Sequence, residues 1–160
     1  MPARSPLGRT TWRVCAALFV AAALSACGPP KPPLLKANVM IGSDVNPDRN
    51  GRASPVVVRV YELKSLAAFN SADFFSIYDK ESETLGPDLN GREELRLKPG
   101  ETALINHPLK PDTKFVAALA AFRDLDKSRW RSALEVPPKK KKLDLTIAIQ
   151  GKTVSVTAAP

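Results

Sequence analysis

From Leu34 onward, apolar and polar residues alternate in short segments that are separated by turn-forming residues. A period of two residues is typical of β-strands that bury one face. The alanine-rich run at 114–122 is compatible with a helix or a strand, and we choose a strand because 130–136 alternates like its hairpin partner. The pattern therefore predicts eight strands, at residues 35–41, 56–63, 94–98, 102–106, 114–122, 130–136, 143–149 and 154–156.

The second of these segments, 56–63, is apolar on both sides apart from Arg59 and Glu62. A strand that alternates has one face in water, whereas a strand without alternation is buried on both faces. We therefore expect this strand to lie in the middle of its sheet.

One stretch between the second and third predicted strands departs from the strand period. Residues 65–78 place Phe74, Ile77 and Tyr78 at helical spacing, which predicts a small helical insert around residues 65–90. We expect the insert to cover one edge or end of the sandwich, where open strands would otherwise pair. We interpret its aromatic residues as the buried face of a short helix rather than a cofactor site; they are Phe69, Phe74, Phe75 and Tyr78.

The first 26 residues differ from the rest. A basic start is followed by Val14–Ala26, an apolar run without a charged residue. As a helix this run would span about 20 Å, which is short of the roughly 30 Å hydrocarbon core of a bilayer. The sequence therefore predicts a cleaved secretory signal at residues 1–26 rather than a membrane-spanning helix.

The end of the apolar run, Leu24-Ser25-Ala26-Cys27, resembles a bacterial lipobox. The resemblance implies that Cys27 is acylated, because its thiol is the nucleophile that forms the thioether to the lipid. It also implies sorting to the outer membrane, because Gly28 is not an aspartate. Residues 27–33 would then be the acylated cysteine and a proline-rich tether that reaches roughly 19 Å, and residues 34–160 would be the folded domain.

Charge and composition exclude several classes of function. The chain has 24 lysine and arginine residues against 16 aspartate and glutamate residues, and three of the arginines lie in the signal. The other 21 basic and 16 acidic residues give a net charge of +5, which is too small for a nucleic-acid-binding protein. There is one histidine, and of the two cysteines Cys15 leaves with the signal and Cys27 is lipidated, which excludes most zinc, haem and iron–sulfur sites.

No arrangement of residues indicates catalysis. His107, the only imidazole, precedes a proline at a strand end, where a hydrogen-bonded surface histidine is the ordinary explanation. The sequence lacks a G-x-S-x-G motif and a glycine-rich phosphate loop, and Glu93-Glu94 is typical of an exposed pair. We therefore expect a protein that is not an enzyme and that has no cofactor, no metal and no small-molecule substrate.

Several short motifs resemble the outer-membrane lipoprotein of bacterial type VI secretion systems, the TssJ or SciN family. They are Asn46-Pro47, Gly51-Arg52, Ser54-Pro55, Val58-Arg59-Val60-Tyr61-Glu62-Leu63, Phe69 and Ala72-Asp73-Phe74. The resemblance implies an all-β fold, a transthyretin-like β-sandwich with a small helical insert. It also implies binding to the C-terminal periplasmic region of the inner-membrane protein TssM, and tethering of that complex to the outer membrane. The alternative is an outer-membrane lipoprotein that acts as a pilotin or binds a glycan or lipopolysaccharide.

The loop at 42–54 is longer than a hairpin requires, and long loops on a rigid sandwich often carry recognition. If the eight strands alternate up and down, this loop meets the connections at 98–101, 122–129 and 150–152 at the end opposite the tether. We expect partner binding at that end.

Within this loop we expect Asn46, Asp48, Arg49 and Arg52 to contact the partner. Pro47 and Gly51 would shape the loop. A purely structural role for Asn46, Pro47 and Gly51 is an equally open alternative.

The same counting of strands places the run Lys139, Lys140, Lys141 and Lys142 at the tether end, beside the helical insert. Four lysines near an anionic bilayer are attracted to it by up to about 1 kcal/mol each. We therefore expect this run to face the outer membrane. The alternative is a solvated charge run that only prevents edge pairing of the next strand.

Overall fold

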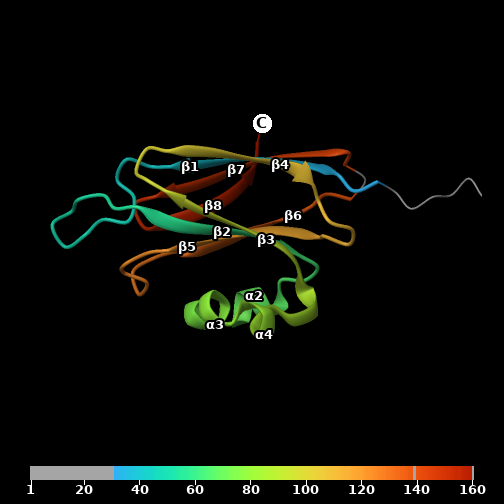
Figure 1. Cartoon of the computed structure of the whole chain (residues 1–160), viewed down its shortest axis with the longest axis horizontal. Coiled ribbons are helices and arrows are strands. Elements are labelled where there is room, and N and C mark those ends of the chain that lie inside the picture. Colours follow the sequence, from blue (N-terminus) through green and yellow to red (C-terminus); the bar gives the residue numbers. More distant parts are fainter. Residues whose placement is uncertain (1–30, 139, 160) are drawn as a thin grey trace, which may run out of the picture. The chain divides into compact units, whose positions relative to one another are not determined.

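Two four-stranded β-sheets pack face to face in the computed structural model, which describes residues 31–138 and 140–159 (Figure 1). The strand order is β4-β1-β7-β8 in the first sheet and β3-β2-β5-β6 in the second. The strands are β1 (Leu34–Ile41), β2 (Val56–Leu63), β3 (Leu89–Leu97), β4 (Thr102–Pro108), β5 (Phe115–Ala121), β6 (Arg131–Glu135), β7 (Lys142–Gln150) and β8 (Thr153–Ala158).

These strands confirm the eight predicted from the period of two, including the choice of strand for the alanine-rich run that forms β5. β2 lies between β3 and β5, as its doubly apolar sequence predicts. The predicted start of β3 is wrong, because the strand begins at Leu89 rather than Glu94. Leu89 and Gly91 pair with the end of β2 across an irregularity at Glu62/Leu63, and such a local break obscures the alternation.

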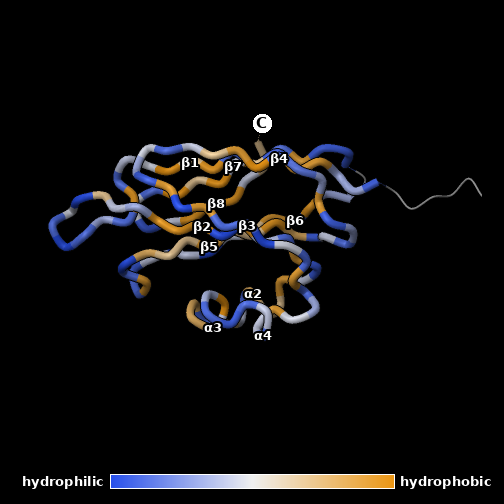
Figure 2. The backbone as a smooth tube through the Cα atoms, in the orientation of Figure 1, coloured by the Kyte–Doolittle hydropathy of each residue, from blue (hydrophilic) through white to orange (hydrophobic). Residues whose placement is uncertain are grey.

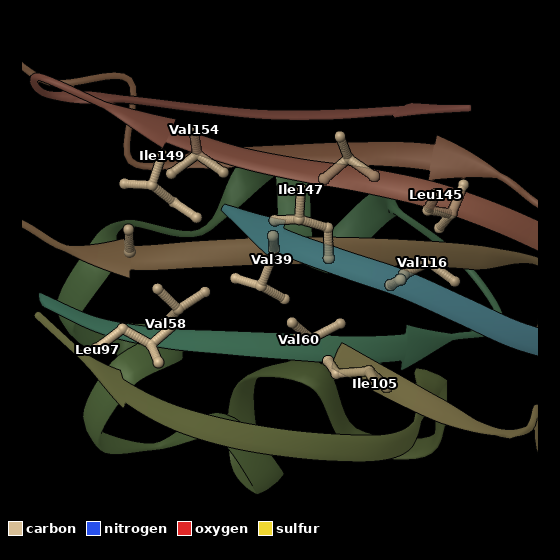
Figure 3. Close-up of a cluster of buried hydrophobic side chains, with 14 of the residues drawn as sticks. Val39, Val58, Val60, Leu97, Ile105, Val116, Leu145, Ile147, Ile149 and Val154 are labelled. Carbon is tan, nitrogen blue, oxygen red and sulfur yellow. The ribbon is translucent and has the colours of Figure 1, made fainter. Parts of the chain in front are cut away.

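Consecutive strands run in opposite directions. β1 is antiparallel to β4 and parallel to β7, and β2 is antiparallel to both β3 and β5. The inward side chains of both sheets form one apolar core; ten of them are labelled in Figure 3, among them Val39, Val58 and Ile147. Figure 2 shows the complementary pattern, with hydrophilic residues gathered in the connections at the two ends.

The helical insert consists of α2 (Ala67–Ser71), α3 (Phe74–Asp79), α4 (Glu81–Leu85) and the short 3-10 helix η2 (Gly86–Asp88). The expectation that it covers an edge or an end is wrong, because the helices lie under the outer face of the second sheet (Figure 1). That face carries Tyr61 and Leu63 of β2 with Ala117 and Leu119 of β5, all fully buried. Apolar side chains on an outer sheet face need a second layer, and the insert supplies it.

The aromatic residues of the insert bear out the predicted buried face only in part. Phe69 and Phe74 are buried, and Phe74 stacks on the ring of Tyr78 at 5.1 Å between centroids. Phe75, however, is 62% exposed. Adjacent residues on a helix point about 100° apart, so Phe74 and Phe75 cannot both face the sheet.

A polar network fixes the insert to the sheet. The Arg59 guanidinium, in the middle of β2, donates to the Glu94 carboxylate at 2.8 Å and to the carbonyl oxygen of Tyr78 at 2.6 Å. Tyr61 donates its hydroxyl to Glu81, and burial raises the pKa of Tyr61 to about 12, so the hydroxyl stays protonated at neutral pH.

On the neighbouring strand, Arg131 of β6 donates to three backbone carbonyl oxygens near the end of α2, those of Phe69, Asn70 and Ala72. One side chain thus satisfies three carbonyls that a helix end leaves without partners. Among the described residues no helix has the length and apolar character needed to cross a membrane.

Replacing Arg59 with methionine should lower the free energy of unfolding by about 2 kcal/mol, because the carboxylate of Glu94 and the carbonyl of Tyr78 both lose a charged donor. Arg96→Met is the matched control: its guanidinium also approaches Glu94, at 3.6 Å, but the side chain is 81% exposed. The control should change the unfolding free energy by no more than about 0.5 kcal/mol. Urea unfolding measures both, and equal effects would mean that Arg59 does not anchor the insert.

Candidate functional site

The loops predicted to gather at one end of the sandwich do so. Backbone hydrogen bonds join Ile41 N to Glu101 O at 2.9 Å, Gly42 N to Ile149 O at 2.8 Å, and Arg129 N to Lys152 O at 2.9 Å. The connections at 42–55, 98–101, 122–130 and 151–152 therefore form one surface, which we call the loop end.

Asn46 holds three of these connections together. Its side chain donates to the carbonyl oxygen of Pro55 at 2.8 Å and accepts from the amide of Arg123 at 2.8 Å, and its amide donates to the carbonyl oxygen of Gly151 at 2.7 Å. The residue is 96% buried and has a φ of 49°, which asparagine tolerates better than most residues. Asn46 therefore positions the loop end, and the geometry does not favour the partner contact expected for it.

Beyond Asn46, residues 47–52 form a tip that is ordered by its own contacts. The Asp48 carboxylate accepts from the amides of Asn50 and Arg52, at 2.8 and 2.9 Å, and from the Arg52 guanidinium at 2.9 Å. The backbone and side-chain donors of Arg52 and the amide of Asn50 lower the pKa of Asp48, which is therefore ionised at neutral pH. Gly51 has a φ of 78°, a backbone conformation that favours glycine.

The tip borders a hollow of about 710 Å³ at the loop end. Its other wall comes from the β5–β6 connection and the β7–β8 turn, where the Lys152 ammonium bonds the Asp124 carboxylate at 2.5 Å. That hydrogen bond lowers the pKa of Asp124. The lining residues are Pro47, Asp48, Arg49, Asn50, Arg123, Asp124 and Lys152.

Only part of this hollow could be found from the sequence. Pro47, Asp48 and Arg49 were predicted site residues and lie together here, whereas the predicted contact Arg52 lies on the tip, paired with Asp48, and does not line the hollow. Sequence reasoning missed Arg123, Asp124 and Lys152. The up-and-down counting of strands placed their loops at this end, but it carried no signal for the individual side chains.

The opposite end holds the entry of the chain into the domain. Leu109 N donates to Pro33 O at 2.9 Å and Leu34 N donates to Lys141 O at 3.0 Å. Lys140, Lys141 and Lys142 are exposed at this end, and Lys142 forms an ion pair with Asp144 at 3.0 Å. Lys139 lies outside the described residues, as do Cys27 and the predicted signal.

A second, smaller hollow of about 210 Å³ lies between the edges of β3 and β4. It contains the buried Glu62, whose carboxylate accepts from the amide of Lys110 at 2.6 Å and the hydroxyl of Thr113 at 3.0 Å. The His107 ring lies 3.9 Å from Glu62 and 3.7 Å from Glu93. His107 is a partly exposed histidine at a strand end, as expected, and within the described residues no cluster of three ligands could hold a metal ion.

Comparison with known proteins bears on the whole domain. Residues 34–152 match the family model described as type VI secretion lipoprotein, VasD, EvfM, TssJ. No curated protein matches the sequence.

Three solved structures are similar to the chain. The type VI secretion lipoprotein TssJ1 from Pseudomonas aeruginosa is 35% identical, over 81% of this chain and 98% of its own, with a TM-score of 0.77. Serratia marcescens Lip, a membrane-bound component of the type VI secretion system, is 23% identical over 81% and 99%, with a TM-score of 0.72, which shows the fold alone. A chain of the structure described as the TssM C-terminal domain from EAEC is 25% identical over 79% and 98%, with a TM-score of 0.63.

The role of Asn46 can be measured directly. Asn46→Ala should lower the free energy of unfolding by about 2 kcal/mol, because a buried carbonyl and a buried amide lose their partner. Asn46→Gly removes the same hydrogen bonds but accepts the positive φ, so it should be less destabilised than the alanine variant.

Asn50→Ala is the control, because Asn50 is exposed and contributes only its backbone amide to the tip. Urea unfolding and the hydrogen-exchange rate of the Arg123 amide provide the readouts. An exchange rate that stays unchanged in Asn46→Ala would contradict the positioning role.

Proposed function

Because the chain belongs to the type VI secretion lipoprotein family, we propose that it is anchored in the outer membrane by an acylated Cys27 and binds a TssM-type inner-membrane protein in the periplasm. The family is a structural component of the type VI membrane complex and not a family of enzymes. The proposed contact is between the loop end of this domain and the C-terminal periplasmic region of the partner. The domain would thereby tie an inner-membrane protein to the outer membrane.

The observation that carries this proposal is the separation of the two ends. The hollow and its tip lie at the loop end, whereas Pro33, the point where the tether enters the domain, lies at the other end. A protein anchored through the tether presents its loop end away from the membrane. Support for the partner comes from the likeness to a chain in a structure described by the TssM C-terminal domain.

The structure also determines how the loop can be tested. Val45, Asn46 and Ser54 are buried, so replacing all of residues 42–54 would disturb the core as well as the surface. Pro47–Arg52 is exposed or half-buried and is the part that can be exchanged without loss of the fold.

Exchanging residues 47–52 for six glycine and serine residues should weaken binding to the purified periplasmic region of the partner by more than tenfold. A tenfold loss corresponds to about 1.4 kcal/mol, which one lost cluster of contacts accounts for. Isothermal titration of the mature lipoprotein in detergent micelles measures the affinity, and urea unfolding confirms that the variant is folded.

Lys140→Glu with Lys141→Glu is the control, because both residues are exposed at the tether end. This variant should bind the partner within twofold of wild type. Full-strength binding by the tip variant would place the partner site elsewhere on the domain.

We also propose that the lysine run 139–142 faces the anionic leaflet to which the acylated Cys27 is attached. Lys140 and Lys141 are exposed beside the start of β1, close to the entry of the tether. Lys142 is paired with Asp144, so it would contribute less than its neighbours. The attraction would fade within a Debye length of about 8 Å at physiological salt.

The Cys27→Ser protein should leave the outer-membrane fraction and keep a weak, salt-sensitive affinity for phosphatidylglycerol vesicles. Reversing all four lysines to glutamate in that protein should weaken vesicle binding at low salt, because each lysine contributes up to about 1 kcal/mol. Co-sedimentation measures the binding, and the variant with the exchanged 47–52 tip, which should bind vesicles as well as its parent, is the control. An unchanged binding curve for the lysine variant would leave the run as a solvated charge cluster.

A further inference from the structure

The charged groups around the loop-end hollow do not balance one another. The Asp48 carboxylate is paired with the Arg52 guanidinium at 2.9 Å, and the Asp124 carboxylate with the Lys152 ammonium. Arg49 and Arg123 also line the hollow, both are exposed, and neither forms an ion pair with any residue that the structure describes. Two guanidinium groups therefore remain available to a ligand.

The two carboxylates are unlike these arginines because they are already satisfied. Asp48 accepts three hydrogen bonds within the tip, and Asp124 accepts the ammonium of Lys152. These donors lower the pKa of both carboxyl groups, so both remain ionised and paired at neutral pH. They offset the charges of Arg52 and Lys152 and leave the positive charge of the hollow with Arg49 and Arg123.

We propose that the hollow binds a carboxylate side chain in an acidic segment of the partner, with Arg49 and Arg123 as the residues that bind it. The inference rests on the proposed function and specifies the chemistry of the partner segment. An arginine donates two parallel hydrogen bonds to a carboxylate, and two arginines at one hollow can hold one carboxylate or two neighbouring ones. With a volume of about 710 Å³, the hollow has room for more than one side chain.

A basic segment does not suit this site. It would bring like charges toward Arg49 and Arg123, and it could use Asp48 or Asp124 only by displacing Arg52 or Lys152. An anionic lipid headgroup carries the same charge as a carboxylate. The hollow, however, lies at the loop end, opposite the entry of the tether, so a protein segment is the ligand that this placement favours.

The test combines Arg49→Glu with Arg123→Glu in the mature lipoprotein in detergent micelles. Binding to the purified periplasmic region of the TssM-type protein should weaken at least tenfold, and the salt dependence of the remaining affinity should become flatter, because the released contacts are charged. Lys31→Glu with Lys64→Glu changes the net charge by the same amount away from the loop end. This control should bind within twofold of wild type.

A second measurement identifies the segment itself. A photo-cross-linking p-benzoylphenylalanine at Asn50, which lines the hollow, should capture a partner peptide that contains aspartate or glutamate. Mutating those acidic residues to arginine in the partner should weaken binding to wild type and restore part of the affinity for the Arg49→Glu, Arg123→Glu variant.

The outcomes separate the two proposals. If wild type binds the partner and the double arginine variant binds equally well, or if the captured peptide lacks an acidic residue, the acidic-segment proposal is overturned while the proposed function stands. If wild type does not bind the partner, both fall. If the double variant loses affinity only for phosphatidylglycerol vesicles, the ligand is a lipid headgroup and the present proposal is overturned.

Discussion

The need to cover both faces of β2 determines most of this architecture. Its inward side chains pack against the first sheet, and its outward ones, Tyr61 and Leu63, pack against the helical insert. Its two charged residues are accommodated by dedicated partners: Arg59 by the carboxylate of Glu94 and Glu62 by the amide of Lys110. A buried charge without such partners would destabilise the fold, so these contacts are as much part of the core as its apolar side chains.

With both faces of the second sheet covered, function falls to the two ends of the sandwich. One end receives the chain at Pro33, and the other gathers four connections around the buried Asn46. Alternation of the strand directions is what separates them, because every connection after an odd-numbered strand returns to the same end. The tip at 47–52 is built on this fixed base and is stabilised by hydrogen bonds to Asp48.

Sequence alone predicts the strands well because a period of two is a local signal that needs no knowledge of neighbours. It misplaced the insert because helical spacing tells which face of a helix is buried and not what buries it; the clue was the doubly apolar sequence of 56–63. The candidate site was half predicted for the same reason. Arg123 and Lys152 reach the hollow through pairings far along the chain, and Arg123 is 77 residues from Asn46, to which its amide bonds.

The length of the strands has a mechanical meaning. β1 runs the full height of the sandwich with eight residues, which at 3.3 Å each is about 26 Å. A stiff block of that height, added to a tether that reaches roughly 19 Å, acts as a spacer between a bilayer and whatever docks on the far side. The tether is the adjustable part of this spacer and the sandwich is the fixed part. An anchored protein of this shape would therefore set the standoff of its partner from the membrane.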